Sequence, residues 1–277
     1  MKHDEGYFKN STGLGIYHQA WLPEREAKAV LLVVHGFAEH SGRYMNIVNR
    51  FVPDGYAVYG LDHPGHGRSE GARACVNSFA DYTGTLAEFA RMVSVWQPGK
   101  PVFLVGHSMG GLIGTLHLID RQQGLNGAIL SAPGVKVPDN ISKFTVFMGK
   151  VISSIMPRLG IITLEEDAVS RDAAVLAAYR NDPLVYHGKV TARLGAEMLK
   201  AMSRVEAEAL RITLPILILQ GTGDRLVPPS GAQMLYDLVS SADKKLIFYN
   251  GFYHEVFNEP EHDRALADVG NWLTAHI

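Results

Sequence analysis

The sequence predicts an α/β fold, a mostly parallel and doubly wound sheet, and two observations lead to this prediction. Short apolar runs rich in β-branched residues recur along the chain, and segments with helical periodicity separate them. Near-continuous apolar runs are typical of parallel strands, because helices cover both faces of their sheet. Parallel strands also need crossover connections, so the alternation of strand and helix indicates βαβ units.

Six apolar runs mark the strands of this sheet, and one helix between them has a clear periodicity. The strands are expected at residues 30–34, 56–61, 102–105, 128–130, 216–219 and 246–249. After the second run, apolar residues recur at spacings of three and four from Phe79 to Trp96, and Pro98 and Gly99 end the pattern. This spacing predicts an amphipathic helix.

The alternation of strand and helix stops at about residue 134 and resumes at about residue 212. Between these points the periodicity is helical, and no convincing strand run appears. We therefore predict a core of residues 1–134 and 212–277, with a helical cap of residues 135–211 inserted in it.

One helical face in the predicted cap is strongly apolar. It consists of Phe144, Phe147, Met148, Val151, Ile152 and Ile155. A helix must bury such a face or use it for binding, so two interpretations stay open. The face packs on the core, or it lines an apolar pocket as a lid, with Lys143, Lys150 and Arg158 against anionic lipid. In the second case the cap makes a peripheral membrane contact.

The composition excludes several classes of protein. Of the 277 residues, 47% are hydrophobic and 19% are charged, which suffices for a large core and is unlike a disordered chain. The net charge is -2 and no block of Lys and Arg appears, so we expect no nucleic-acid partner. Charges interrupt the most apolar window, residues 144–164, which is not expected to span a membrane. The single Cys75 and the absence of an apolar N-terminal stretch favour a cytoplasmic protein.

A G-x-S-x-G pattern at residues 106–110 follows the apolar run at 102–105 and precedes a helical pattern. In this strand, turn and helix context, the glycines permit a strained turn that exposes the serine side chain above the sheet edge. Ser108 is therefore the candidate nucleophile. A serine hydroxyl is a poor nucleophile at neutral pH unless a base takes its proton, and histidine titrates in the right range.

The base and the acid are chosen by chain order and by position at strand ends. In folds with this turn, the partners follow in the order Ser, acid, His. His254 comes shortly after the strand at 246–249, at the carboxyl edge where open α/β sheets bind ligands. The other downstream histidines, His187, His262 and His276, lie in the cap or the last helix. Asp224 comes shortly after the strand at 216–219 and would hold the imidazole in the correct tautomer. We therefore predict a catalytic triad of these two residues and Ser108.

Two backbone positions are candidates for an oxyanion hole. Attack on an ester carbonyl creates an oxyanion, which is usually bound by the N–H after the serine and by another from the loop after an earlier strand. Met109 and Phe37 occupy these positions, and Gly36 would let the backbone turn inward. We predict that their N–H groups form the oxyanion hole.

The loop from Asp62 to Ser69 contains two histidines, but no second cluster supplies the further ligands of a zinc centre. Its glycines and proline instead favour a tight structural loop, with Asp62 paired to Arg68. No G-x-G-x-x-G or Walker pattern appears. We therefore predict neither a metal nor a cofactor.

Six segments carry a resemblance to a known family. They are residues 35–44 (HGFAEHSGRY), 62–71 (DHPGHGRSEG), 106–111 (GHSMGG), 181–184 (NDPL), 220–227 (QGTGDRLV) and 253–255 (YHE). Together they resemble the monoacylglycerol lipases and their lysophospholipase-like relatives among the α/β-hydrolases. The similarity extends from about residue 5 to the C-terminus.

The resemblance implies the α/β-hydrolase fold, the same triad, and a lipid ester substrate with one acyl chain bound under a helical cap. It also implies that Glu39 and Arg43 order the polar end of the pocket, where a head group lies. An exposed ion pair four residues apart is the alternative for these two residues. The chain departs from some mammalian members at Phe257, where they have another histidine.

We therefore predict a serine hydrolase that cleaves monoacylglycerols to a fatty acid and glycerol through an acyl-enzyme. A lysophospholipase or a broad-specificity carboxylesterase with the same triad is the alternative, because fold and triad do not define the pocket. A ligand-binding protein that has lost turnover is a further alternative, which the complete triad disfavours.

Overall fold

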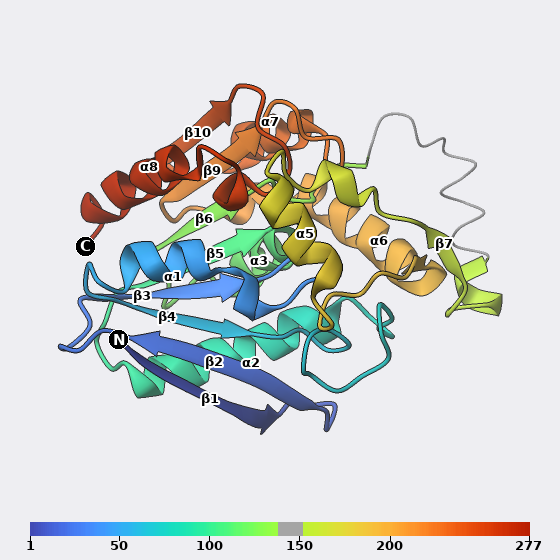
Figure 1. The fold of residues 1–277 in the computed structure, drawn as a ribbon, viewed down its shortest axis with the longest axis horizontal. Helices are drawn as coiled ribbons and strands as arrows, with labels where there is room; N and C mark the ends of the chain where they lie inside the picture. Colours follow the sequence, from blue (N-terminus) through green and yellow to red (C-terminus); the bar gives the residue numbers. More distant parts are fainter. Residues whose placement is uncertain (138–151) are drawn as a thin grey trace.

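The computed structural model describes residues 1–137 and 152–277 (Figure 1). Its centre is an eight-stranded sheet with the order β1-β2-β4-β3-β5-β6-β9-β10. The strands are β1 (Lys2–Lys9), β2 (Gly15–Leu22), β3 (Ala29–Val34), β4 (Tyr56–Leu61), β5 (Val102–His107), β6 (Gly127–Ser131), β9 (Ile216–Gly221) and β10 (Lys244–Tyr249). The six strands from β4 to β10 in this order run parallel, whereas β1 and β2 pair antiparallel. All six predicted strands are present, and they are the six parallel ones.

The antiparallel hairpin of β1 and β2 was not predicted from the sequence. β1 is the edge strand, and its sequence KHDEGYFK is mostly exposed and charged. β2 contains polar residues between its buried positions. β1 is not an apolar run, because an edge strand is not covered on both faces. β2 contributes to both cores, but His18 and Gln19 interrupt its apolar run.

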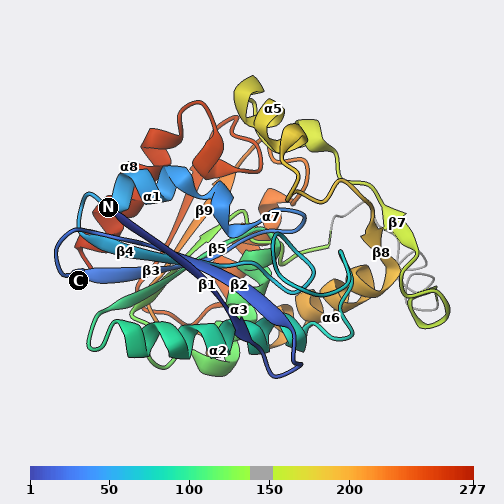
Figure 2. The same cartoon turned by 60° about the horizontal axis from the view of Figure 1, so that its bottom comes forward.

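Helices cover both faces of the sheet, so the predicted fold class is confirmed (Figure 2). On one face lie α1 (Met45–Phe51) and α8 (His262–Thr274), and on the other lie α2 (Ala80–Trp96), α3 (Met109–Arg121) and α7 (Pro229–Leu238). The helix predicted from Phe79 to Trp96 corresponds to α2.

Each face of the sheet has its own apolar core, to which alternate residues of a strand contribute. In β3, for example, Val30 and Leu32 pack with α2 and α3, whereas Leu31 and Val33 pack with α1 and α8. This alternation follows from the two-residue period of a strand. Burial on both faces explains why the parallel strands are continuous apolar runs.

The segment between β6 and β9 contains α5 (Ala173–Asn181), α6 (Ala192–Glu208) and two short antiparallel strands, β7 (Gly160–Ile162) and β8 (Val190–Thr191). The expectation that this segment has no strand was therefore wrong. With three and two residues, these strands are too short to produce a recognisable apolar run. The division into a core and a cap stays a prediction.

Most of the predicted apolar face of the cap lies outside the described residues. This applies to Phe144, Phe147, Met148 and Val151, and also to the basic residues Lys143 and Lys150. Ile155, at the end of that face, is described and is 75% exposed. Over residues 1–137 and 152–277, no helix combines the length and the apolar character needed to cross a bilayer.

Candidate active site

Ser108 occupies a sharp turn between β5 and α3. Its backbone has φ 54° and ψ -118°, a conformation that residues other than glycine rarely adopt. The turn requires glycine on its α3 side, because a Cβ on Gly110 would lie 2.0 Å from the carbonyl oxygen of Val34. A Cβ on Gly106 would likewise lie 2.8 Å from the carbonyl oxygen of Gly110. The geometry is therefore the strained strand-to-helix turn that the G-x-S-x-G pattern indicates.

Asp224 and His254 lie together at the same edge of the sheet. They follow the neighbouring parallel strands β9 and β10, and His254 Nδ1 is 2.8 Å from Asp224 Oδ2. Both side chains are buried. The other carboxylate oxygen, Oδ1, accepts hydrogen bonds from the backbone N–H groups of Leu226 and Val227 at 2.8 and 3.0 Å. Asp224 is therefore fixed from both sides and can orient the imidazole.

The contact between these two residues changes the pKa of both. Burial acts to lower the pKa of His254, but the Asp224 carboxylate raises it above its ordinary value. Burial acts to raise the pKa of Asp224, but His254 and the two backbone donors hold it below its ordinary value. The pair therefore favours an ionised aspartate, which stabilises a protonated imidazole beside it.

A cavity of about 280 Å³ brings the predicted residues together. Ser108 and His254 line it, and so do Phe37 and Met109. Most of the remaining wall is apolar and comes from both the sheet edge and the segment between β6 and β9. Within the described residues, no hydrogen bond joins Ser108 Oγ to His254, and such contacts are often long before substrate binds. The other downstream histidines, His187, His262 and His276, do not line this cavity.

The loop that carries Phe37 is held in place by several contacts. The Gly36 N–H donates to Glu39 Oε1 at 2.6 Å, and the Ala38 carbonyl accepts from the Tyr186 N–H at 2.8 Å. Ala38 has a positive φ of 69°. Met109 is the first residue of α3, so its N–H has no acceptor within the helix. Both predicted oxyanion donors therefore belong to fixed backbone beside Ser108.

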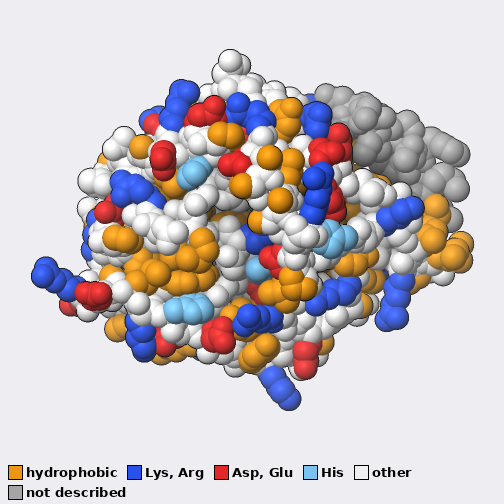
Figure 3. All heavy atoms as spheres, viewed as in Figure 1, with side chains coloured by type: hydrophobic (Ala, Val, Ile, Leu, Met, Phe, Trp, Pro, Cys, Tyr) orange, Lys and Arg blue, Asp and Glu red, His pale blue; other side chains and the backbone are white. Residues whose placement is uncertain are grey.

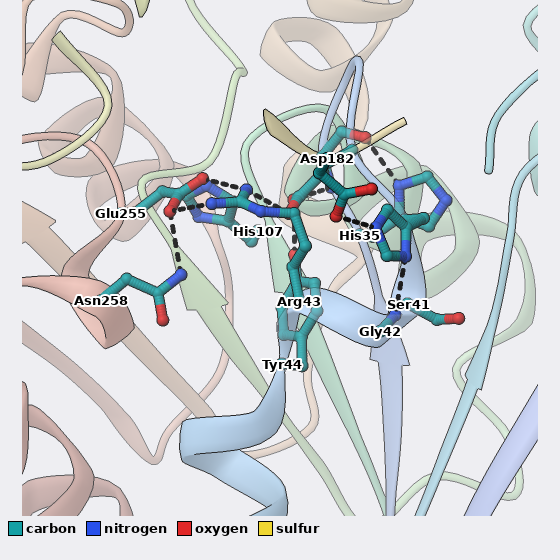
Figure 4. A network of polar contacts seen from close by, with 12 residues as sticks. His35, Ser41, Gly42, Arg43, Tyr44, His107, Asp182, Glu255 and Asn258 are labelled. Atoms are coloured by element: carbon teal, nitrogen blue, oxygen red, sulfur yellow. Dashed lines mark hydrogen bonds and ion pairs between the residues drawn. The ribbon is translucent and has the colours of Figure 1, made fainter. Parts of the chain in front are cut away.

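Glu39 and Arg43 are not the exposed pair that was the alternative for them. Their side chains are 5% and 9% exposed, and Arg43 Nη1 lies 3.0 Å from Glu39 Oε2. Arg43 also contacts Glu255, with 2.9 Å between Nη2 and Oε2 (Figure 4). The Tyr179 ring of α5 packs over the guanidinium at 4.7 Å. Glu39 lines the main cavity, whereas Arg43 lies behind it against a smaller cavity.

This buried cluster has a defined charge distribution. Burial raises the pKa of Glu39, against the effect of Arg43. Burial also acts to raise the pKa of Glu255, but Arg43 holds it below its ordinary value. The imidazole of His107 lines both cavities, and burial lowers its pKa to about 3. Arg43 therefore neutralises a carboxylate directly adjacent in sequence to His254.

Glu255 and His107 were not predicted as site residues from the sequence. Both flank predicted triad residues in the sequence, which was the available signal. Their contacts depend on the folded chain, since Glu255 meets Arg43 across 212 positions.

The loop from Asp62 to Ser69 differs from its prediction in one respect. Asp62 Oδ2 accepts a hydrogen bond from the backbone N–H of Arg68, but the guanidinium contacts Glu5 instead. The expected side-chain pair was therefore wrong, although the tight loop is present. His63 and His66 are buried there, and in the part of the chain that the structure describes no three His, Cys, Asp or Glu side chains are arranged to hold a metal ion.

Replacing Arg43 by Met should destabilise the protein strongly. The change leaves two carboxylates buried without their cation, and breaking a buried ion pair in this way costs about 3 to 5 kcal/mol. Urea unfolding monitored by circular dichroism measures the loss. Arg211→Met is the matched control, because it removes a solvent-exposed pair with Glu208 and should have little effect. Equal effects of the two changes would contradict the importance of the buried cluster.

Comparisons with known proteins identify the family of this chain. The model of the serine aminopeptidase S33 family matches residues 25–261. A monoacylglycerol lipase of Mycolicibacterium smegmatis is 36% identical over 273 residues, which cover 99% of this chain and 98% of that protein. The human monoglyceride lipase is 35% identical over 274 residues, which cover 98% and 90%.

A solved structure of a related protein has the same fold. The crystal structure of a monoacylglycerol lipase from Paleococcus ferrophilus superposes with a TM-score of 0.83 at 30% identity and covers both chains completely. The resemblance inferred from the six sequence segments is therefore confirmed. The chain belongs to the serine aminopeptidase S33 family of α/β-hydrolases, with monoacylglycerol lipases among its relatives.

Proposed function

We propose that this protein is a carboxylic ester hydrolase that cleaves monoacylglycerols to a fatty acid and glycerol. The observation that carries the proposal is the apolar cavity that ends on Ser108 and His254. Such a cavity suits an acyl chain, with the ester carbonyl at the polar end. The named activity of the relatives supports the same substrate class. The word aminopeptidase in the family description does not decide the substrate, because one fold hosts many chemistries.

The proposed reaction proceeds through an acyl-enzyme. Ser108 Oγ attacks the ester carbonyl while His254 Nε2 takes the hydroxyl proton, since Nδ1 is occupied by Asp224. The N–H groups of Phe37 and Met109 bind the oxyanion. His254 then protonates the departing glycerol oxygen, and the acyl group remains on Ser108. A water molecule, deprotonated by the same imidazole, releases the fatty acid and restores the serine.

Glu39 has a proposed role at the polar end of the cavity. Its carboxylate lines the wall near Ser108 and accepts the hydrogen bond of Gly36, next to Phe37. Glu39 can therefore hold the loop that carries Phe37 in place, on the side of the cavity where the glycerol head group would lie. Arg43 contributes to this order through Glu39 and not by direct contact with the cavity.

Ser108→Ala should abolish hydrolysis. We expect the wild type to cleave 1-monoacylglycerols faster than matched lysophosphatidylcholines. The rate of the variant should be about 10⁶-fold lower, at the background rate. Initial rates by fatty-acid release measure this, and a fluorophosphonate probe should label the wild type alone. Faster turnover of the lysophospholipids would favour the lysophospholipase alternative, and labelling that persists in the variant would reject Ser108 as the nucleophile.

Activity should fall in acid at a pH set by His254. The base must be neutral, and its pKa is raised, so protonation begins at a higher pH than for an ordinary histidine. As the pH decreases, kcat/KM on a soluble short-chain ester should therefore fall to half of its plateau value at a pH above 6.5, the ordinary pKa of histidine. The profile is measured between about pH 5 and pH 9, with Ser108→Ala as the blank. A midpoint at or below the ordinary value would contradict the contact with Asp224.

Residues 135–211 form the cap in this proposal, inserted in a core of residues 1–134 and 212–277. The cap also contacts membranes peripherally. Support comes from Ile155 and Met156, which are 75% and 53% exposed, and from the exposed Arg158 beside them. Figure 3 shows apolar side chains exposed at the edge of the molecule where Figure 1 draws β7. Apolar residues next to a basic one are typical of an interfacial contact.

Replacing both Ile155 and Met156 by Asn should weaken binding to vesicles. The change removes apolar side chains from the contact, and burying one such side chain stabilises by about 1.5 to 3 kcal/mol, so the loss should reach about ten-fold or more. Co-sedimentation with vesicles containing phosphatidylcholine and phosphatidylglycerol measures it. Val95→Asn is the control, because Val95 is 67% exposed, between the values of Ile155 and Met156, but lies in α2. Unchanged binding in the double variant would reject this contact.

A further inference from the structure

One position in the α6 wall of the cavity differs from its neighbours. Gly195, Met198, Leu199 and Met202 all line the cavity, and their spacing places them on one face of α6. At a rise of 1.5 Å per residue, this face follows the cavity for about 10 Å. Three of the positions carry long or branched apolar side chains, whereas Gly195 carries none.

Gly195 lies at the outer end of the cavity. A Cβ on Gly195 would lie within 4 Å of Ile161 in β7, and Figures 1 and 2 draw β7 away from β5 and α3, between which Ser108 lies. Ile161 and Ile162 of β7 line the same end and are 37% and 45% exposed, so this end is close to the surface. Only the distal carbons of an acyl chain bound at Ser108 can therefore reach Gly195.

The backbone does not require glycine at this position. Glycine is one of the least favourable residues within a helix, and Gly195 does not have a positive φ. A Cβ at this position would lie 3.6 Å from Ile161 Cδ1 and 3.9 Å from Val190 Cγ1, which is ordinary van der Waals contact. Alanine therefore fits, whereas a longer side chain must extend past β7 into the cavity.

We propose that Gly195 determines specificity for acyl-chain length. Its missing side chain keeps the outer end of the cavity open for the distal carbons of a long acyl chain. A short acyl chain on Ser108 ends before it reaches β7, so it does not depend on this space. The inference rests on the proposed esterase function and deepens it, because it names long-chain acyl esters as the substrate class.

The test compares Gly195→Leu with Gly195→Ala. Each is assayed on glycerol monoesters from butanoyl to octadecanoyl and on the matching p-nitrophenyl esters. We expect Gly195→Leu to lower kcat/KM for octadecanoyl esters about ten-fold or more, with a change below about two-fold for butanoyl esters. Gly195→Ala should have the same kcat/KM as the wild type at every chain length, because its Cβ makes only ordinary van der Waals contacts.

An equal loss at all chain lengths, or an unchanged rate on octadecanoyl esters, would overturn the role of Gly195. Labelling of Ser108 by a small fluorophosphonate reports folding independently of chain length. If Gly195→Leu is not labelled, Gly195→Met is judged by the same criteria, since its side chain is flexible. A chain-length effect on p-nitrophenyl esters without turnover of any glycerol monoester would keep the role of Gly195 and reject the glycerol substrate.

Discussion

The parallel register of the sheet is the constraint on which the site depends. β3, β5, β9 and β10 run in one direction, so the residues that follow them meet at one edge of the sheet. Phe37, Ser108, Asp224 and His254 each follow one of these strands. A slip of one residue would move every side chain of the strand to the opposite face. The two apolar cores prevent such a slip, so burial of the strands also fixes the positions of the polar residues beyond them.

The ionic cluster around Arg43 connects two parts of this edge that the sheet leaves independent. Arg43 contacts Glu39 in the loop after β3 and Glu255 in the loop after β10. Removing such charges from water is costly, so stability alone is a poor explanation for their burial. The cluster instead links the backbone that carries Phe37 to the backbone that carries His254. The ring of Tyr179 extends this link to α5.

The sequence predicts those features that depend on local pattern. Burial on both faces produces the apolar runs, and the ends of the runs locate Ser108 and His254 at the correct edge. The hairpin of β1 and β2 was missed because the edge strand β1 is mostly exposed and polar residues interrupt β2. The environment of Arg43 could not be predicted, because its contact with Glu255 joins residues 212 positions apart and pattern gives no depth of burial. The exposed pair that was the alternative for Glu39 and Arg43 is therefore a buried cluster in the structure.

The position of the segment between β6 and β9 has an evolutionary consequence. These two strands are parallel neighbours in the sheet, with Ala128 opposite Ile216, so the segment leaves the carboxyl end of β6 at Ser131 and crosses over to the amino end of β9 at Ile216. The segment supplies much of the apolar wall, whereas Ser108 and His254 belong to the sheet edge. Exchange of one contiguous stretch of sequence can therefore alter the apolar wall while Ser108 and His254, the proposed catalytic residues, stay in place. Diversification of ligand preference in this architecture needs no coordinated change in the rest of the chain.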